Sequence, residues 1–406
     1  MEKKPLSGIK VVDLSTYVAA PSCCRALADW GADVIKVESL EGDMWRNMGK
    51  VLFTTVSDQE NPCYDVINAN KRCISLDLKS KEGQEVMYKL LGEADIFVTN
   101  NRESALKKMG MDYECLKVKY PKLIYALVTG FGEEGPDAAN PGFDVAAFWS
   151  KSGFLGDVVQ PGNYLPTPPP AFGDLTTGLA LFGSVCGALY QRTVTNKGDK
   201  VSVSLYGTAI WCSSFGVITT QKDAGYKNVF PKTRYNANPL MISYKCSDNE
   251  WLLLAILDFN KYYKSFYTAI GVPELVDDER FNTRDGMFKN REEFIKILEN
   301  QFILKTTAEW SQILGSIDVV CDIVGHFKDI CKDEQAWANN YLCDFKFDSG
   351  NSAALPRPAM YTSAMGLPEY KRSPLLGEHT AEILTNLGYT QEQIKAMAEA
   401  SIIKEK

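Results

Sequence analysis

The chain has 406 residues and a formal net charge of −7, so nucleic acid is not an expected partner, because phosphate backbones attract basic surfaces. A hydrophobic fraction of 45%, with no run approaching the roughly 18 apolar residues that span a bilayer, predicts a globular protein of two domains without a membrane segment. The eleven cysteines form no CxxC pair and only two histidines are present, so we expect reduced thiols, no metal site and a cytoplasmic location.

The first predicted elements are a strand, a helix and a second strand. Ile9–Leu14 has the pattern of a strand, Pro21 is typical of a first helical turn, and Gly31 is a helix stop before the strand Val34–Val37. This spacing predicts a βαβ unit with parallel strands and a right-handed crossover. The connection Ser15–Ala20 then lies at the carboxyl end of a strand, where open α/β sheets bind ligands.

The alternation of strands and helices continues along the first half of the chain. Further strands are predicted at Ile74–Asp77, Asp95–Thr99, Leu123–Val128 and Val201–Leu205, and further helices at Lys81–Leu91 and Thr176–Gln191. Five prolines between residues 154 and 173 predict an extended loop just before the second of these helices.

The second half of the chain has a different pattern. A hairpin is predicted from Met241–Cys246 and Trp251–Ile256, with helices at 260–270, 291–303, 307–314 and, as a closing amphipathic helix, Thr390–Lys404. We therefore expect an α/β fold of two domains. Residues 1–222 form the N-terminal part of a large domain, 223–325 a small α+β domain, and 326–406 a linker that returns to the large domain.

Short motifs in a fixed order are spread over nearly the whole chain. They are Leu6–Val11, Ala20-Pro21, Gly31–Glu38, Asn70–Arg72, Gly130–Pro136, Phe172–Asp174, Thr193–Lys200 and Leu375–Thr380. In order and spacing they resemble the class III CoA-transferases, the family of the formyl-CoA, carnitine, aryllactate and 2-hydroxyisocaproate CoA-transferases. The resemblance implies a Rossmann-like large domain with a smaller α+β domain, in a homodimer of interlocked, ring-like chains.

Asp174 lies where the proline-rich loop meets a predicted helix. Aspartate is a favoured helix N-cap, so one interpretation is that Asp174 only caps this helix. The resemblance instead implies that Asp174 is the nucleophile, which attacks a thioester to form an aspartyl mixed anhydride and CoA thiolate. The thiolate returns to give an aspartyl-CoA thioester, and an acceptor acid takes CoA through a second anhydride. Coenzyme A thioesters are then substrates, and no tightly bound cofactor is implied.

An acidic chain needs local positive charge to bind CoA. Clusters at Lys71-Arg72, Arg102 and Lys107-Lys108 supply such charge, although a single cluster of this kind is more often ordinary solvated surface. The resemblance implies CoA contacts at Tyr17, Val18, Ala19, Lys71, Arg72, Asn100, Arg102, Lys108 and Met109. Ser39 stands where formyl-CoA transferase has a phosphate-binding arginine, so one cation is missing or is supplied elsewhere.

The acyl pocket is the part of the site that decides the substrate. The resemblance implies that Thr16 and Tyr17 line it, with Phe143, Phe148 and Trp149 as further candidates, although aromatic side chains are equally typical of a core. We expect CoA transfer from a donor of the cinnamoyl-CoA type to an (R)-2-hydroxy acid such as phenyllactate. The acid 2-hydroxyisocaproate and a betaine such as carnitine stay as alternatives, because a methylene changes binding by only about 1–3 kcal/mol. A 2-hydroxyacyl-CoA dehydratase is the downstream partner that such a product suggests.

Other functions fit the sequence less well. The α-methylacyl-CoA racemases share the fold and the aspartate but also need a histidine, and Phe143 occupies its position with a ring that cannot transfer a proton. A dehydrogenase would need the GxGxxG pattern after the first strand. A CoA-binding protein without turnover stays open as an alternative. Formyl-CoA transferase shields its aspartate with a glycine run, which is absent here, where Tyr235–Pro239 occupies the comparable region.

Overall fold

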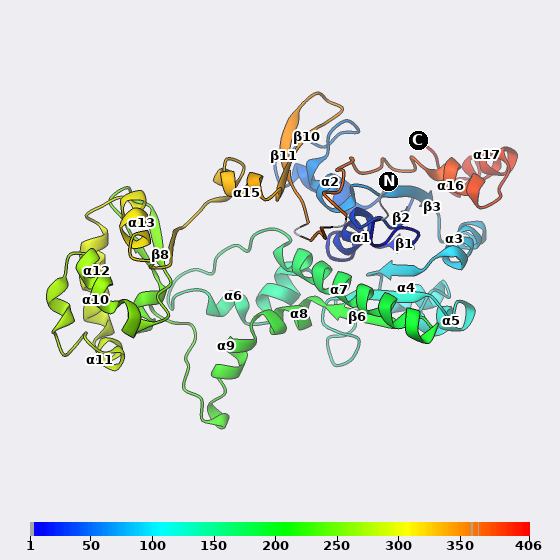
Figure 1. The fold of residues 1–406 in the computed structure, drawn as a ribbon. Coiled ribbons are helices and arrows are strands. Elements are labelled where there is room, and N and C mark those ends of the chain that lie inside the picture. Colours follow the sequence, from blue (N-terminus) through cyan, green and yellow to red (C-terminus); the bar gives the residue numbers. More distant parts are fainter. Residues whose placement is uncertain (1–3, 359, 364) are drawn as a thin grey trace. The chain divides into compact units, whose positions relative to one another are not determined.

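The computed structural model describes residues 4–358, 360–363 and 365–406, which form two compact units (Figure 1). The first unit comprises Met1–Phe154, Thr167–Ile218 and Glu334–Lys406, and the second comprises Leu155–Pro166 and Thr219–Asp333. The second unit therefore ends later than residue 325, and it also takes 155–166, which the sequence assigns to the large domain.

The first unit contains the following helices and strands. They are β1 (Lys10–Leu14), α1 (Ala19–Asp29), β2 (Asp33–Glu38), η1 (Met44–Lys50), α2 (Pro62–Asn68), β3 (Arg72–Leu76), α3 (Lys81–Glu93), β4 (Ile96–Thr99), α4 (Glu103–Lys108), α5 (Tyr113–Lys119), β5 (Ile124–Thr129), η2 (Asp144–Ser150), α7 (Phe172–Thr195), β6 (Lys200–Ser204), α8 (Leu205–Cys212), α9 (Ser214–Thr219), α15 (Glu334–Ala338), β10 (Leu342–Lys346), β11 (Ser352–Pro356), α16 (Thr380–Asn386), α17 (Gln391–Glu399) and β12 (Ile403–Lys404).

A seven-stranded sheet organises this unit, in the order β12-β3-β2-β1-β4-β5-β6. All neighbours are parallel except β12, which pairs antiparallel with β3. Within the predicted βαβ unit, Val12 lies opposite Ile35 on parallel strands, so that unit and the α/β class are confirmed. Gly31 follows the helix with a φ of +99°, a conformation that favours glycine. The helix begins at Ala19, two residues before the predicted Pro21.

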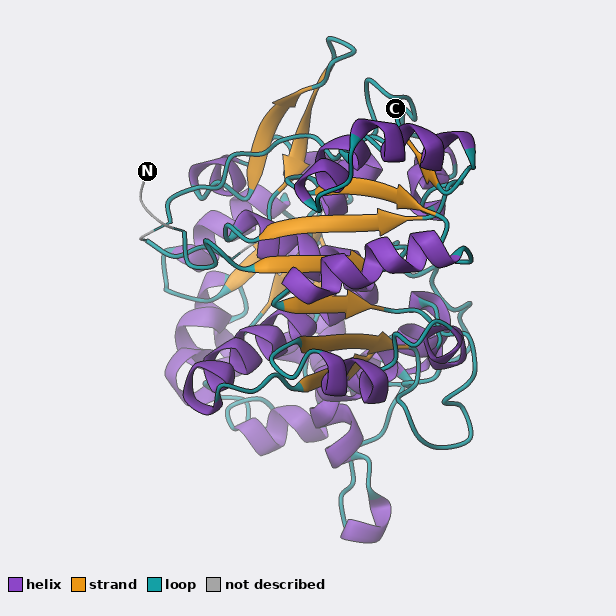
Figure 2. Cartoon of the chain, turned by 90° about the vertical axis from the view of Figure 1, so that its right-hand side faces the viewer, coloured by secondary structure: helices purple, strands orange, loops and turns teal. Residues whose placement is uncertain are grey.

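Helices cover both faces of this sheet (Figure 2). On one face, Val12, Leu14 and Val37 pack into a hydrophobic core with side chains of α3, α16 and α17. Because side chains alternate along a strand, Val11 and Asp13 point to the opposite face, towards α1. The sheet is thus closed off by helices on both sides, as parallel sheets usually are.

Charged side chains are buried in the face that α1 covers. Lys71 donates to Asp13 at 2.8 Å and Lys36 pairs with Asp43 at 2.9 Å, and all four side chains are fully buried. Burial disfavours the charged form of Asp13, but the ammonium groups of Lys71 and Lys36 outweigh burial and lower its pKa. Lys36 also donates to the carbonyl of Ser15, so this network fixes the start of the loop after β1.

The C-terminal segment closes the sheet in a way that the sequence does not predict. The expected helix Thr390–Lys404 ends at Glu399, and Ile403–Lys404 then pairs with β3 as β12. Thr380 donates to the carbonyl of Lys404 at 2.8 Å and tethers this short strand.

The second unit is a small α+β fold. Its helices and strands are η3 (Lys222–Ala224), η4 (Arg234–Asn236), η5 (Pro239–Met241), β7 (Ser243–Lys245), β8 (Trp251–Leu254), α10 (Phe259–Ala269), η6 (Pro273–Val276), α11 (Arg284–Lys289), α12 (Arg291–Phe302), α13 (Thr307–Gly315), β9 (Cys321–Ile323) and α14 (Phe327–Ile330); α6 (Phe154–Asp157) lies where the chain enters it from the first unit. The predicted hairpin is confirmed, since β7 and β8 pair antiparallel with Tyr244 opposite Leu252. Phe294 and Trp310 belong to a separate hydrophobic core in this unit.

Candidate active site

Asp174 lies in the first turn of α7, which begins at Phe172, earlier than the predicted Thr176. The N-cap is Ala171, in the left-handed region with a φ of 57°, and no side chain caps the helix by a hydrogen bond. The interpretation of Asp174 as the N-cap of this helix is therefore wrong. Its carboxylate is available for another role.

A close contact between α1 and α7 decides which way the Asp174 turn points. A methyl group on Gly178 would lie 2.0 Å from the Ser22 hydroxyl and 2.6 Å from the carbonyl of Ala19, so the two helices meet backbone to backbone there. Further along, Phe182 contacts Trp30 edge to face with ring centroids 5.0 Å apart. The two helices therefore run in the same direction. The turn that carries Asp174 extends towards the start of α1 and the loop that precedes it.

The loop before α1 is held at the carboxyl edge of the sheet. Asn100, directly after β4, accepts from the Thr16 N–H at 3.0 Å and donates to the Thr16 carbonyl at 2.8 Å. The next residue, Tyr17, is left-handed with a φ of 63°, and its N–H donates to Asp43 at 3.2 Å. Val18 and Ala19 follow as buried residues. A non-glycine residue in this conformation is uncommon and is often found at functional sites.

Two glycines bring a second loop to the same edge. A methyl group on Gly130, directly after β5, would lie 2.5 Å from the Cα of Gly142, so the two backbones touch. Phe143 follows and meets Tyr17 edge to face, with ring centroids 5.5 Å apart. Asp144 then begins η2, a π-helical turn of a kind often found at functional sites. The loops after β1 and β5 thus meet through Tyr17 and Phe143.

Asp144 brings a second carboxylate to Asp174. A methyl group on Gly173 would lie 2.2 Å from the Asp144 Oδ1, so Asp144 packs directly against the start of α7. Burial, and then the like charge of Asp144, raise the pKa of Asp174 to about 7. Burial also raises the pKa of Asp144, against the opposing effect of the Gly173 and Asp174 N–H groups and of the Trp149 side chain. Sequence analysis missed Asp144, although it adjoins Phe143.

The predicted aromatic residues separate into two groups. Phe148 and Trp149 are buried and lie against each other with ring centroids 5.9 Å apart, so they belong to the core beneath the site. The predicted Phe143 is 52% exposed, and Phe172, which the sequence analysis did not assign to the pocket, is 48% exposed. Three of these aromatic side chains are therefore open to a ligand, namely Phe143, Phe172 and the half-buried Tyr17. The buried pair lies beneath them, with Phe148 in contact with Phe172.

The predicted CoA contacts also separate. Lys71 donates to Asp13, to the carbonyl of Pro21 and to Asn68 at 2.8 to 2.9 Å, so its three N–H groups are all used and it is buried. Arg72 pairs with Asp33 and Glu382 at the opposite, amino edge of the sheet. Neither residue is positioned to contact a nucleotide at the carboxyl edge, and we do not retain them as CoA contacts.

The cations on α4 differ from those two residues. Arg102, the N-cap of α4, and Lys108, in its last turn, are exposed, and the described residues offer neither of them an ion-pair partner. Both follow β4 at the carboxyl edge. Met109 ends the helix, half-buried against the core.

One further cation at this edge was missed from the sequence. Ser39, where an arginine is expected by resemblance, follows β2, and its carbonyl accepts from Ser75 of the adjacent β3 at 3.1 Å. Lys79 lies three residues after the end of β3, is exposed, and has no ion-pair partner in the part of the chain that the structure describes. Because β2 and β3 are parallel neighbours, the segments that follow them, with Ser39 and Lys79, leave the sheet at the same edge.

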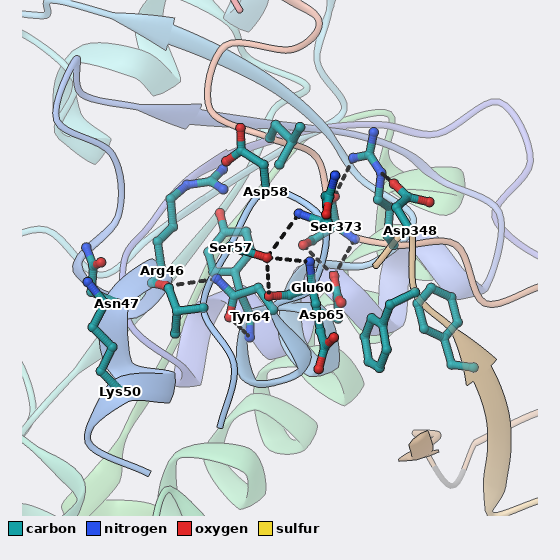
Figure 3. Close-up of a pocket in the computed structure, with 17 residues that line it drawn as sticks. Arg46, Asn47, Lys50, Ser57, Asp58, Glu60, Tyr64, Asp65, Asp348 and Ser373 are labelled. Carbon is teal, nitrogen blue, oxygen red and sulfur yellow. Dashed lines mark hydrogen bonds and ion pairs between the residues drawn. The ribbon is translucent and has the colours of Figure 1, made fainter. Parts of the chain in front are cut away.

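A cavity of about 450 Å³ lies elsewhere in the first unit (Figure 3). Arg46, Tyr64, Asp65 and Ser373 are among its lining residues, and Asp65 accepts from the N–H of Ser373 at 2.7 Å. Arg46 is held by Glu38 through two hydrogen bonds of 2.7 and 2.8 Å. None of the predicted site residues lines this cavity.

Comparisons with known proteins identify the family. A model described as CoA-transferase family III matches residues 6–380. The chain is 41% identical over 400 residues to (R)-2-hydroxy-4-methylpentanoate CoA-transferase of Clostridioides difficile, covering 98% of this chain and 99% of that relative. It is 41% identical over 394 residues to cinnamoyl-CoA:phenyllactate CoA-transferase of Clostridium sporogenes, covering 96% and 95%.

A solved structure agrees with these relatives. The crystal structure of a CAIB/BAIF family protein from Brucella suis matches with a TM-score of 0.80 and 30% sequence identity, covering 95% of this chain and 100% of that one. The family predicted from the motifs is confirmed. The chain belongs to CoA-transferase family III and is a class III CoA-transferase.

Proposed function

We propose that this enzyme moves CoA from an acyl-CoA to a free (R)-2-hydroxy acid, with Asp174 as the covalent nucleophile. The observation that carries the proposal is the state of Asp174. It lies partly buried in the first turn of α7, it does not cap the helix, and burial beside Asp144 raises its pKa to about 7. A carboxylate with a raised pKa is a stronger nucleophile than an ordinary one and is still charged in a substantial fraction of molecules at neutral pH.

The reaction proceeds through acyl exchange on this carboxylate. An Asp174 oxygen attacks the thioester carbonyl, the carbon–sulfur bond breaks, and the thiolate leaves with its electron pair. The thiolate then attacks the aspartyl carbonyl of the mixed anhydride and releases the donor acid, leaving an aspartyl-CoA thioester. The acceptor carboxylate attacks this thioester, and the thiolate takes the acceptor acyl group from the second anhydride. Asp174 is regenerated, and no phosphate is consumed because one thioester replaces another.

The carboxyl edge of the sheet provides the binding surface in this proposal. Tyr17, Val18 and Ala19 lie beside the start of α1, where the acyl group and the pantetheine chain pass towards Asp174. Positive charge for the nucleotide phosphates comes from Arg102, Lys108 and Lys79. Lys79 takes the place of the phosphate-binding arginine that formyl-CoA transferase has at the position of Ser39. Their exposure and the absence of ion-pair partners for them among the described residues support these roles.

The acid that we favour is an aryllactate such as phenyllactate, with a donor of the cinnamoyl-CoA type. Support comes from Tyr17, Phe143 and Phe172, aromatic side chains that are open to a ligand and suit an aryl ring. The second candidate is (R)-2-hydroxy-4-methylpentanoate, because the relative that acts on this acid is also 41% identical. A 2-hydroxyacyl-CoA product would then be consumed by a dehydratase in the cytoplasm.

The nucleophile is tested with Asp174→Asn. We expect the variant to lose at least about 10³-fold in kcat, as catalytic nucleophiles do when they are removed. Wild-type enzyme incubated with cinnamoyl-CoA and hydroxylamine should yield a hydroxamate at residue 174, detectable by peptide mass spectrometry. Transfer at the wild-type rate by the variant, with deamidation excluded, would refute the proposal.

The substrate is tested by competition. Cinnamoyl-CoA is offered with equal concentrations of (R)-phenyllactate, (R)-2-hydroxy-4-methylpentanoate and carnitine, and the new acyl-CoA species are separated by chromatography. We expect phenyllactyl-CoA to form fastest. Faster formation of the 4-methylpentanoate product would reverse the preference and leave the Asp174 mechanism intact.

We also propose that the enzyme is a homodimer. By length and composition α7 could cross a membrane, but it packs against α1 and β6 on one side. On its other side Leu179, Tyr190 and Val194 are exposed, and Trp211 of α8 is 81% exposed. A second copy that covers these side chains would explain an apolar helix whose outer side is otherwise in water.

A further inference from the structure

Asp144 is buried in a place where a carboxylate is costly. It is 7% exposed, and neither oxygen forms a hydrogen bond of ordinary geometry with any described residue. The N–H groups of Gly173 and Asp174 and the side chain of Trp149 lie near enough to favour its charged form. A buried carboxylate without stronger partners is rare, because burial penalises its charge unless some function retains it.

Asp144 fits the start of α7 closely. A methyl group on Gly173 would lie 2.2 Å from the carboxylate and 2.3 Å from the Phe148 ring, so only glycine allows Asp144 to reach this helix turn. The first N–H groups of a helix lack partners within the helix and carry its positive end, so they attract a carboxylate. Ala171, the N-cap, has no side-chain group to satisfy them.

No cation of the described residues shields the two carboxylates from each other. The charged residues on elements packed against α7 are engaged elsewhere, since Arg25 pairs with Asp29 on α1 and Lys200 of β6 pairs with Glu133. Lys151, directly after η2, pairs with Asp137. Among the described residues, Asp144 is the one charged group that acts on Asp174.

We propose that Asp144 is a positioning residue for the nucleophile, which packs against the first turn of α7 and destabilises the free Asp174 carboxylate relative to its acylated form. The inference rests on the proposed function of Asp174. When the Asp174 oxygen attacks the thioester and the carbon–sulfur bond breaks, the negative charge moves from Asp174 to the departing sulfur, away from Asp144. Acylation therefore relieves the repulsion between the two carboxylates, and the covalent intermediate becomes more stable relative to the free enzyme.

The test is Asp144→Asn, which keeps the shape of the side chain and removes its charge. The variant is equilibrated with cinnamoyl-CoA and then treated with hydroxylamine, and we expect a smaller fraction of it to be trapped at Asp174. That fraction should fall by about tenfold for each pH unit by which repulsion from Asp144 raises the pKa of Asp174. The acidic limb of the pH dependence of kcat/KM should move to lower pH. Asp112→Asn is the matched control, because Asp112 is 6% exposed and caps α5 by accepting from the Cys115 N–H at 3.3 Å, outside the proposed site.

The outcomes separate a charge effect from a packing effect. If Asp144→Asn lowers the melting temperature and kcat together at every pH without moving the acidic limb, Asp144 serves packing alone and the inference is wrong. An unchanged pH profile and an unchanged trapped fraction also overturn it. Loss of all trapping in Asp174→Asn, alongside an unaffected Asp144→Asn, would leave the proposed function standing without this inference.

Discussion

At the scale of single residues, the candidate site differs from the sheet in whether its buried carboxylates have a cation beside them. Lys71 and Asp13 neutralise each other at 2.8 Å in the sheet, whereas Asp174 and Asp144 are two carboxylates brought together without a cation from the described residues. The first arrangement lowers the pKa of Asp13, and in the second the pKa values of both carboxyl groups are raised. The balanced pair supports the fold, and the unbalanced pair lies where we propose that the reaction takes place.

The protonation of Asp174 gives a prediction for the reaction rate. Only the carboxylate can attack a thioester, and burial with the charge of Asp144 raises its pKa to about 7. We expect kcat/KM to rise with pH between 5 and 8, with a midpoint near 7, because the reactive form appears as the proton leaves. Initial rates in buffers of constant ionic strength measure this profile. A rate that is flat across the same range contradicts it.

Two cations that the sequence treats alike should behave differently when removed. Lys71→Met leaves Asp13 charged and buried, so we expect the free energy of unfolding to fall by about 3–5 kcal/mol. Arg102→Ala removes an exposed cation, so we expect little change in stability and a rise of roughly 3- to 10-fold in KM for acyl-CoA, larger at low salt. Denaturant titration and steady-state kinetics measure the two effects. A higher KM without instability in Lys71→Met would restore its predicted CoA contact.

The residues explain how far prediction from sequence could go. Asp174 was predicted because a local motif carries it, and local motifs need no tertiary information. Lys71 was interpreted as a ligand contact because Asp13, its partner, is distant in the chain and becomes a neighbour only through strand pairing. Asp144 was missed for the same reason, since the role that we propose for it depends on its approach to Gly173 in space.

At the scale of elements, the contact between α7 and α1 positions Asp174, the proposed nucleophile. The strand–helix order was predicted well because hydrophobic periodicity is local, and the bounds of β1, α1 and β2 match the prediction within two residues. The start of α7 was placed too late because Phe172 and Gly173 read as the end of a loop. The close approach of α7 to α1 at Gly178 could not be predicted, because a glycine has no side chain whose chemistry indicates which residues it contacts.

The α1–α7 contact can be tested with one methyl group. Gly178→Ala would place a Cβ 2.0 Å from the Ser22 hydroxyl and 2.6 Å from the carbonyl of Ala19, so we expect a loss of about 1–3 kcal/mol in stability and a lower kcat. Gly92→Ala on α3 is the control, because its Cβ would meet only Tyr120 at 3.6 Å and should be neutral or stabilising. Thermal unfolding and initial rates compare the pair. Equal effects of the two substitutions would exclude close helix contact as the cause.

At the scale of the whole molecule, two units arise from a chain that leaves the first unit and returns to it. Composition and pattern changes predicted this division, but the assignment of residues 155–166 to the second unit depends on contacts that no local pattern encodes. The exposed apolar side of α7 is a similar case. Its sequence is that of a core helix, and its surroundings within one chain leave Leu179, Tyr190 and Val194 uncovered.

The proposed homodimer predicts a change of mass on substitution. Wild-type enzyme should elute with the mass of two chains at micromolar concentration, and Leu179→Asp should weaken the dimer because it buries a charge in an apolar interface. Val118→Asp is the control, since Val118 is exposed on α5 and lies outside the proposed interface. Size-exclusion chromatography with light scattering measures the molar mass of the wild-type enzyme and of both variants. A wild-type monomer at that concentration would rule out the dimer.

The short strand β12 has a consequence for how the chain is made. Ile403 and Lys404 cover the edge of β3, a strand that is synthesised more than three hundred residues earlier. During translation, which proceeds from the N-terminus, that edge stays without this neighbour until more than three hundred further residues have been added. An unpaired strand edge invites association with other chains. The nascent protein must therefore carry an open sheet edge until Ile403 and Lys404 emerge, and removing residues 403–406 would make that state permanent.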